Sequence, residues 1–358
     1  MAVTLRDVAA LAGVSAITAS RALNNSGYVS QQTRARVLAA ADQLSYVPNA
    51  VASSLRSNKT QLFAFLTDIT NPFWALVERS IEDAAQEGGY SVILCNTDED
   101  RVKEARYIDL LLRMRVDGLI IAPTRGSTGI LQTLARRQLP FVLIDRLVQG
   151  VVADSVRGDS RGGAYTITQH LIATGYRRIG IISGPLTVST AEERVAGYKQ
   201  ALEEAGRAPD PSLILYGQYS ESWGYQATQK LMARRSCPDA IFAANNFIAL
   251  GVLEALHTSG LQVPQDVAVV SFDDVTQITS TRFLTTIVQP AAEMGRIAVR
   301  LLLDRLAGPD KAPEDIVLPV ELILGSSCGC DPRAIAPARG GDVSLSGVAG
   351  RATDLLRG

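Results

Sequence analysis

From residue 61 onward, short apolar runs alternate with amphipathic stretches of helical periodicity. The runs come in two sets of four: LFAFLTD, SVILCNTD, GLIIAPT and PFVLID, then RIGIISG, LILYGQ, AIFAANN and VAVVSFDD. Unbroken apolar strands that alternate with helices are typical of parallel sheets covered on both faces. The pattern therefore predicts a two-lobed α/β body with two doubly wound parallel sheets.

Polar or small residues follow nearly every run. They are Thr67 and Asp68, Asn96, Thr124, Asp145, Ser183, Asn245 and Asn246, and Asp273 and Asp274. Open parallel sheets bind ligands at the carboxyl edge of their strands, so these residues predict a binding crevice between the lobes. Taken singly, each has turn chemistry as an alternative explanation, because Asp and Asn commonly end strands.

The body carries no motif for nucleophilic catalysis or phosphate binding. It has no G-x-S-x-G, no phosphate loop and no G-x-G-x-x-G before a helix. His170 is expected within a helix and His257 near a helix end, away from the strand ends. We therefore expect a binding device that uses no cofactor, and not an enzyme.

The first sixty residues show helical spacing only. Leu5, Val8 and Leu11 form one apolar face that ends at Gly13, a second helix follows at once, and a third is expected over residues 30–44. Two helices joined by a tight turn containing glycine form a helix-turn-helix, which places its second helix in the DNA major groove.

Charge supports this interpretation of the first sixty residues. They contain six basic and two acidic side chains, a balance of +4 in a chain whose net charge is −1. A basic head on an acidic body is typical of a nucleic-acid footprint, although one solvated basic face is the alternative.

The candidate base-reading face is Ala16, Ile17, Ser20 and Arg21. Arginine can fork onto guanine O6 and N7, whereas Ala16 and Ile17 offer only apolar contact to a thymine methyl. Short polar groups near helix ends suit phosphates, although each alone could be a simple cap. They are Thr4, Ser15, Thr18, Asn24, Ser30 and Thr33.

The segment YVPNAVASSL, residues 46–55, predicts a short and weak helix. Pro48 suits a first helical turn and ends the preceding helix. Isolated helices shorter than roughly 12–15 residues are marginal in water, so this one needs a partner. An ordinary linker is the alternative.

The stretch VTLRDVAALAGVSAITASRALNNSGYVSQQTRARVLAAADQLSYVPNAVASSLRS closely resembles the headpiece of the LacI/GalR family of bacterial transcriptional regulators. The resemblance implies a hinge helix that pairs with its dimer mate and inserts Leu55 between base steps in the minor groove. It also implies DNA contacts from Leu5, Tyr28, Tyr46, Asn49 and Ala52. The specificity positions fall on Ala16 and Ile17.

Residues 61–330 resemble the periplasmic sugar-binding-protein fold that this family carries behind its headpiece. The resemblance implies effector contacts from Asp68, Phe73, Trp74, Asp145, Arg194, Trp223, Asn245, Asp273 and Gln289. Aromatic faces stack on sugar C–H surfaces, and charged groups bind hydroxyls directionally. Two alternatives remain: Phe73 and Trp74 could be core residues, and Arg194 could pair with Glu193 on a helix surface.

Two positions depart from the family pattern. Val188 stands where the purine-responsive branch has an arginine, which disfavours a purine effector. Asn246 stands where the family has an aspartate. We expect a sugar or sugar derivative, and because Arg194 and Arg146 are in reach, a sugar acid or phosphorylated sugar stays open.

The four cysteines are scattered except for one CGC near the end, and with two histidines they give no zinc-ligand spacing. We expect a reduced, metal-free protein. The N-terminus lacks a secretory signal and no apolar run could span a bilayer, so we expect a cytoplasmic protein with no membrane partner.

The expected domains are a helix-turn-helix domain (1–46), a hinge helix and linker (47–60), two effector-binding lobes and a disordered tail (331–358). The N-lobe comprises 61–159 and 291–318, and the C-lobe comprises 160–290 and 319–330. The tail has too few leucines at heptad spacing for a tetramerising helix, so we expect a homodimer.

These features predict a repressor whose two headpieces bind a near-palindromic operator and whose affinity is controlled by a small-molecule effector. A sugar-binding protein without a transcriptional role is one alternative. A two-lobed sugar-processing enzyme is another.

Overall fold

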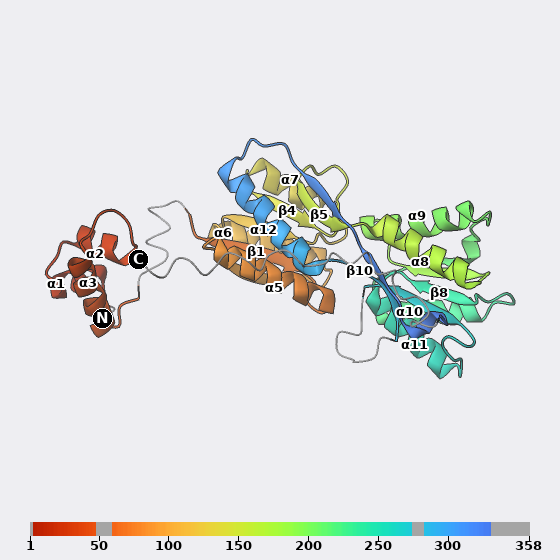
Figure 1. Ribbon diagram of the computed structural model, residues 1–358. Coiled ribbons are helices and arrows are strands. Elements are labelled where there is room, and N and C mark those ends of the chain that lie inside the picture. The colour runs from red at the N-terminus through yellow and green to blue at the C-terminus, as the bar shows by residue number, and fades with distance from the viewer. Residues whose placement is uncertain (1–2, 48–58, 274–282, 331–358) are drawn as a thin grey trace, which may run out of the picture. The chain divides into compact units, whose positions relative to one another are not determined.

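The structure, a computed structural model, describes residues 3–47, 59–273 and 283–330, and the chain divides into two compact units. Unit 1 comprises Met1–Leu62 and Leu111–Asp117, and unit 2 comprises Phe63–Leu110 and Gly118–Gly358. Figure 1 shows the helices of the first unit and the sheets of the second. Each unit has its own hydrophobic core.

Three helices form the N-terminal part of unit 1: α1 (Leu5–Leu11), α2 (Ala16–Leu23) and α3 (Gln31–Gln43). Their core is made mostly of small residues: Val8, Ala9, Ala12, Ala19, Ala22, Val37, Ala40 and Ala41. The expectation that Leu11 faces inward is wrong, since its side chain is 48% exposed. The residues of this segment that are buried in the core are Val8, Ala9 and Ala12.

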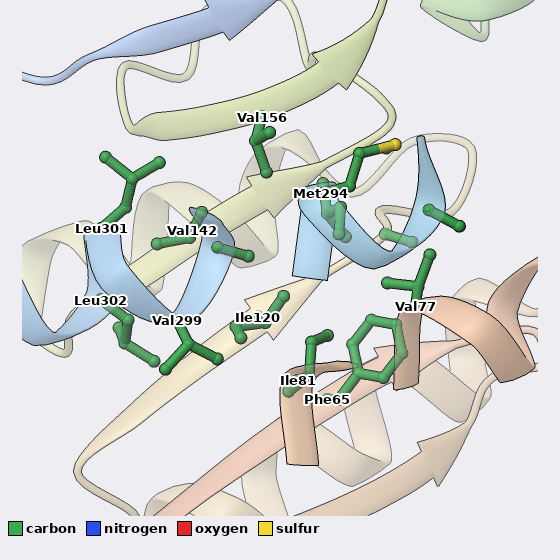
Figure 2. Packing of buried hydrophobic residues seen from close by; sticks show 14 of the residues in the cluster. Phe65, Val77, Ile81, Ile120, Val142, Val156, Met294, Val299, Leu301 and Leu302 are labelled. Atoms are coloured by element: carbon green, nitrogen blue, oxygen red, sulfur yellow. The ribbon is translucent and has the colours of Figure 1, made fainter. Parts of the chain in front are cut away.

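The first lobe of unit 2 is built on a six-stranded sheet in the order β11-β5-β4-β3-β1-β2. Its strands are β1 (Leu62–Thr67), β2 (Ser91–Asn96), β3 (Gly118–Ile121), β4 (Phe141–Ile144), β5 (Asp154–Gly158) and β11 (Asp315–Leu318). Its helices are α5 (Pro72–Glu87), α6 (Arg101–Met114), α7 (Thr128–Arg136) and α12 (Ala291–Ala307). Figure 2 shows Val77 and Ile81 of α5 and Val299 and Leu302 of α12 packed with Ile120 over this sheet.

The second lobe repeats the plan with the order β12-β10-β9-β8-β6-β7. Its strands are β6 (Ile179–Ser183), β7 (Ile214–Tyr216), β8 (Ala240–Ala243), β9 (Ala268–Phe272), β10 (Thr285–Val288) and β12 (Glu321–Ile323). Its helices are α8 (Ser160–Thr174), α9 (Ser189–Glu204), α10 (Glu221–Met232) and α11 (Asn246–Thr258), with short 3-10 turns η1 (Pro211–Leu213) and η2 (Ser326–Cys328).

All eight strands expected from the apolar runs are confirmed, and the two-sheet α/β class is correct. The structure adds β5, β10, β11 and β12 to the predicted set. The strands from β1 to β11 in the first sheet and from β7 to β10 in the second are parallel, whereas β12 runs antiparallel to β10. In the described part of the chain, no helix is long and apolar enough to cross a membrane.

The chain crosses between the lobes after β5, after β10 and between β11 and β12. The three crossings touch one another: a Cβ at Gly158 would overlap the side-chain oxygen of Gln289 and contact Val320. The backbone N–H of Asp159 donates to the carbonyl oxygen of Leu318 at 2.9 Å. A glycine is therefore required where these segments meet.

A second glycine permits close packing of α10 against α11, because a Cβ at Gly224 would overlap the carbonyl oxygen of Ile248. We predict that Gly224→Ala lowers the free energy of unfolding of unit 2 by about 1–3 kcal/mol, since the helices must move apart. Urea unfolding followed by tryptophan fluorescence measures this, because Trp74 and Trp223 place one reporter in each lobe.

Gly129→Ala is the matched control. Gly129 lies in α7, and a Cβ added there would meet no atom within 4 Å. This change should raise stability by about 0.5–1 kcal/mol because alanine is the better helix former. Equal behaviour of the two variants would contradict the packing argument.

Candidate functional site

The three headpiece helices begin at side-chain caps. Ser15 Oγ accepts from the N–H of Thr18 at 3.2 Å, and Ser30 Oγ accepts from the N–H of Thr33 at 3.2 Å. At α1, the N–H and hydroxyl of Thr4 both donate to Asp7, which holds the pKa of that carboxyl below its ordinary value. These hydroxyls fix the helix starts while the residues stay at the surface.

Helix α2 presents an apolar side chain to solvent at its start. Ile17 is 68% exposed, and Arg21 is exposed one turn later with its side-chain stem next to Gly27. Ser20 is half-buried and its hydroxyl accepts from the side-chain amide of Asn24 at 3.2 Å. An exposed isoleucine beside an exposed arginine suits contact with base edges in a groove.

The other predicted DNA-binding residues divide into three groups. Tyr28 is 92% exposed. Leu5, Ala16 and Tyr46 are partly buried and pack against the headpiece core. The predicted hinge contacts lie outside the described residues: Asn49, Ala52 and Leu55.

A cavity of about 710 Å³ lies between the two lobes of unit 2. Its lining from the first lobe is Asp68, Thr70, Asp98, Glu99 and Arg125. Its lining from the second lobe is Pro185, Val188, Gln218, Tyr219, Ser220, Glu221 and Phe247. The cavity has the size of a small-molecule site and lies at the carboxyl ends of the strands, where parallel sheets bind ligands.

Asp145 and Asp273 occupy equivalent positions after β4 and β9. Both have positive φ, +67° and +65°, and both are buried. Each backbone N–H donates to the neighbouring strand, Asp145 to Val156 at 2.9 Å and Asp273 to Ile287 at 2.8 Å. Non-glycine residues in this conformation are strained and cluster at functional sites.

Arg194 is buried on the inner side of α9. It does not form the surface ion pair with Glu193 that was the alternative. Its NH1 donates to the carbonyl oxygen of Ala244 at 2.6 Å, and its NH2 lies 3.8 Å from Asp273 Oδ2. Its guanidinium lies over the ring of Phe272 at 3.7 Å. Gln289 donates to the other oxygen of Asp273 at 2.9 Å, which extends the network to the lobe crossing.

The positive charge of Arg146, in the first lobe, is also balanced by nearby carboxylates. It makes two contacts of 2.8 Å to the carboxylate of Glu99 and lies 3.5 Å from Asp145. Burial disfavours the charged form, but these carboxylates hold the pKa of Arg146 above its ordinary value. The guanidinium also lies 5.9 Å from the ring centroid of Tyr219 in the second lobe.

Several buried polar atoms at the strand ends have no hydrogen-bond partner among the described residues. They include Thr67 Oγ1, Asp145 Oδ1, Ser183 Oγ and Gln289 Oε1. Buried polar groups are normally satisfied, so each exception requires an explanation. Two come from the first lobe, one from the second and one from a crossing, so unpartnered polar atoms lie at the strand ends of both lobes.

The aromatic side chains expected to stack on the ligand pack elsewhere. Trp74 is 4% exposed and lies edge-on to Phe65 and Phe73 within the core of the first lobe. Trp223 is half-buried and its ring nitrogen donates to the carbonyl oxygen of Ser183 at 3.1 Å. None of Phe73, Trp74 and Trp223 lines the cavity described above, so the packing favours the core alternative for Phe73 and Trp74.

Asn245 caps α11, since its side-chain oxygen accepts from the N–H of Ile248 at 3.1 Å. Asp68 is the one predicted contact that lines the cavity, and it also accepts from the N–H and hydroxyl of Thr70. The structure therefore brings Asp145, Arg194, Asp273 and Gln289 to a buried network at the strand ends and places Asp68 at the cavity wall.

Asn71 of the first lobe contacts Asn246 of the second lobe. The sequence pattern at the strand ends gave no sign that these two residues would meet. Asn71 Nδ2 donates to Asn246 Oδ1 at 3.0 Å, and Asn246 Nδ2 donates to Asn71 Oδ1 at 2.8 Å. Both residues are buried at the N-terminal ends of helices α5 and α11. Tyr219 is another cavity residue without a sequence signal, since GQYSESW matches no motif.

Two further polar contacts bridge the lobes. The N–H of Leu147 donates to Ser189 Oγ at 2.9 Å, and Arg157 pairs with Glu193 at 3.1 Å. With the asparagine pair, they connect the lobes by a few directional bonds.

Comparison with known proteins identifies two regions. A family model for bacterial regulatory proteins of the lacI family matches residues 4–49. A model for a periplasmic binding protein-like domain matches residues 168–328.

Whole-length relatives match almost the entire chain. It is 34% identical over 327 residues to the HTH-type transcriptional repressor PurR of Photobacterium profundum, covering 90% of this chain and 98% of that protein. The solved lac repressor dimer bound to operator and the anti-inducer ONPF is 31% identical, with a TM-score of 0.81 and coverage of 92% and 99%. The transcriptional regulator CelR in complex with cellobiose is 34% identical, with a TM-score of 0.70 and coverage of 91% and 99%.

The reciprocal amide pair can be tested by a double-mutant cycle. We predict that Asn71→Ala and Asn246→Ala each destabilise unit 2 by about 1–3 kcal/mol, because each leaves the buried Nδ2 donor of the other asparagine without its acceptor. The double variant should cost about 1 kcal/mol less than the sum. Urea unfolding measures all three variants, and a cycle is needed because Asn71 also caps α5.

Ser220→Ala combined with Asn71→Ala is the control cycle. Ser220 caps α10 through the N–H of Trp223, so its loss should add to that of Asn71 without coupling. Additivity in the Asn71–Asn246 cycle would remove the pair as a link between the lobes.

Proposed function

This chain belongs to the lacI family of bacterial regulatory proteins and is a DNA-binding transcriptional regulator, and we propose that a neutral sugar in the crevice of unit 2 controls it. The observation that carries the proposal is the set of unpartnered buried atoms at the strand ends, within the described residues. Hydroxyl groups of a sugar both donate and accept hydrogen bonds, so a sugar in the crevice could bind unpartnered atoms of both lobes.

The pairing of the buried arginines supports a neutral ligand over a sugar acid or a phosphorylated sugar. Arg146 is matched by Glu99 and Asp145, and Arg194 faces Asp273. The cavity wall adds Asp68, Asp98 and Glu221 and one arginine, Arg125. An anion in this site would meet more carboxylates than cations, which costs binding energy.

Val188 supports the exclusion of a purine. It lines the cavity and is buried, so the position that carries an arginine in the purine-responsive branch offers an apolar surface here. A base edge would lack a donor at this place. The CelR relative was solved with cellobiose, a neutral sugar, which is consistent with the proposal.

The DNA-binding half of the proposal places α2 in the major groove of an operator. The lac repressor relative is a dimer on its operator, and we infer the same arrangement here, with two headpieces on a near-palindromic site in the bacterial cytoplasm. We infer that the protein represses transcription, as the PurR and lac repressor relatives are named for doing. The proposed domain boundaries are those expected from the sequence, with a hinge at 47–60, most of which lies outside the described residues.

The base-reading role of Arg21 gives a direct test. We predict that Arg21→Ala weakens binding to the selected operator by about 1–3 kcal/mol and leaves binding to random DNA nearly unchanged, because a guanine fork is lost. Gel shift against an operator selected from a near-palindromic library measures both affinities.

Arg36→Ala is the control for Arg21. Arg36 is exposed on α3, so any loss should be similar on operator and random DNA. If Arg21→Ala also weakened both DNAs equally, Arg21 would be a phosphate contact.

The effector proposal predicts which molecules stabilise the protein. Neutral sugars should raise the melting temperature of full-length protein in a thermal-shift screen, and sugar phosphates and purines should not. Asp145→Asn should lower affinity for the stabilising sugar about tenfold to a hundredfold, because a carboxylate acceptor becomes an amide. Asparagine tolerates the positive φ at this position, so the fold should persist.

Asp210→Asn, at the half-buried cap of η1, is the control and should bind the sugar normally. A screen in which only purines or only phosphorylated sugars stabilise the protein would overturn the neutral-sugar proposal. Failure of operator selection would separately overturn the DNA-binding proposal.

A further inference from the structure

Three metal-ligating side chains lie together in the second lobe, away from the crevice residues. His170 comes from α8, and Cys328 and Cys330 come from the CGC motif at and after η2. His170 Nε2 lies 3.3 Å from Cys328 Sγ and 3.9 Å from Cys330 Sγ, and the two sulfurs are 2.7 Å apart. The histidine is separated from the cysteines by 158 and 160 residues, so folding alone assembles the group.

The three donor atoms all lie within 4.8 Å of one another, close enough to bind one cation together. Around a tetrahedral Zn²⁺ with Zn–S distances of about 2.3 Å, two sulfurs lie roughly 3.7–3.8 Å apart. Binding therefore requires the two sulfurs to move apart by about 1 Å, and the half-buried Cys330 is the one with room to move. We propose that His170, Cys328 and Cys330 form a site for a thiophilic d10 cation, Zn²⁺ or Cu⁺.

The surrounding fold positions Cys328 independently of any cation. Thr285 at the start of β10 donates its hydroxyl to Cys328 Sγ at 3.0 Å, and the hydroxyl of Tyr176 donates to the carbonyl oxygen of Cys328 at 2.9 Å. Ser327 is fixed by its N–H to the carbonyl oxygen of Phe283 at 2.8 Å. Cys328 is therefore fully buried and held from three sides.

Gly329 brings the second sulfur to the same side as the first. Its φ is +74°, a conformation that side chains rarely adopt. This left-handed residue turns the chain so that Cys330, which is half-buried, returns toward Cys328 and His170. The spacing C-G-C thus gives a chelate of one buried and one accessible thiol.

The donor set decides the class of cation. Two thiolates and an imidazole favour Zn²⁺ and Cu⁺, whereas Mg²⁺, Ca²⁺ and Mn²⁺ prefer oxygen ligands. Three protein ligands suit three-coordinate Cu⁺ or a zinc ion with a fourth, exchangeable ligand. The imidazole nitrogen lies within 3.9 Å of both sulfurs and supplies the third ligand that a metal site needs.

The proposal has a consequence for the second lobe. The ligands join α8 to the segment after β12, at the end of the described chain, and Thr285 links the group to β10. A bound cation would tie these elements together and raise the melting temperature of the lobe, because it binds the folded chain preferentially.

Cadmium titration of the full-length protein tests the site. The protein is reduced, stripped with a chelator and kept anaerobic, and Cd²⁺ serves as the spectroscopic probe for zinc-type thiolate sites. We expect about one Cd²⁺ per chain and an ultraviolet charge-transfer band from both thiolates. Competition with Zn²⁺ and, in a separate arm, with a Cu⁺ chelator then identifies the preferred cation.

The variants separate the ligands from the other thiols. Cys330→Ser, at the half-buried position, should weaken the band and binding, and His170→Gln should keep the band but lower Zn²⁺ affinity at least about tenfold. Cys237→Ser, at an exposed cysteine elsewhere, should bind like the unmodified protein. Circular dichroism of each variant confirms that loss of binding is not loss of fold.

Three results would overturn the site. One is the absence of cation binding by the reduced protein, and another is unchanged affinity in Cys330→Ser or His170→Gln. The third is the formation of a Cys328–Cys330 disulfide in a protein that binds no cation. Diamide is the oxidant in this experiment, and it takes one hydrogen from each thiol. That outcome would make the pair a redox site.

Discussion

Both lobes of unit 2 depend on a geometric constraint of parallel sheets: strands that run in one direction all end at the same edge. In each lobe the helices cover the faces of the sheet, so the strand ends are the place where polar side chains can be concentrated without disrupting the core. Asp145 after β4 and Asp273 after β9 share the same backbone conformation and the same hydrogen bond to the next strand. Each lobe thus contributes one polar sheet edge of the same design to the crevice. The chain crossings at Gly158 and Gln289 join the two lobes at these edges.

Charge compensation follows from burying cations at that edge. Arg146 and Arg194 are nearly inaccessible to solvent, and a buried guanidinium without a carboxylate or carbonyl partner would cost several kcal/mol. Each is matched within its own lobe, Arg146 by Glu99 and Arg194 by Ala244 and Asp273. The arginines therefore shape the site, while the unpartnered hydroxyl, carboxyl and amide oxygens and the Nε–H of Arg146 remain for a ligand. This division of roles is the physical basis for preferring a neutral polyhydroxylated molecule.

Sequence pattern predicted the strands with long apolar runs and missed β5, β10, β11 and β12, whose apolar runs are shorter or interrupted by polar residues. The strand β5, DSVRG, is polar along its length, and β12 has three residues, so neither shows the apolar run that marked the other strands. The site residues that pattern could predict are those at strand ends and on the inner side of helices, such as Asp273 and Arg194, which lie close together. The pattern could not predict that Trp74 packs against Phe65 in the core. Pairings across long separations, Asn71 with Asn246 and His170 with the CGC motif, need the folded topology, because no spacing rule relates such residues.

The contacts between the lobes are weak enough to be switched by a ligand. The described polar ones are the asparagine pair, the bond from Leu147 to Ser189 and the pair of Arg157 with Glu193, and the guanidinium of Arg146 also lies 5.9 Å from the ring centroid of Tyr219. A net hydrogen bond contributes about 1 kcal/mol, and a partly exposed ion pair contributes less. Their sum is a few kcal/mol, which is the size of typical coupling energies of about 1–3 kcal/mol between an effector and a distant site. A sugar that satisfies atoms of both lobes adds bonds of the same kind to the same interface, so its binding can decide which lobe arrangement the protein adopts.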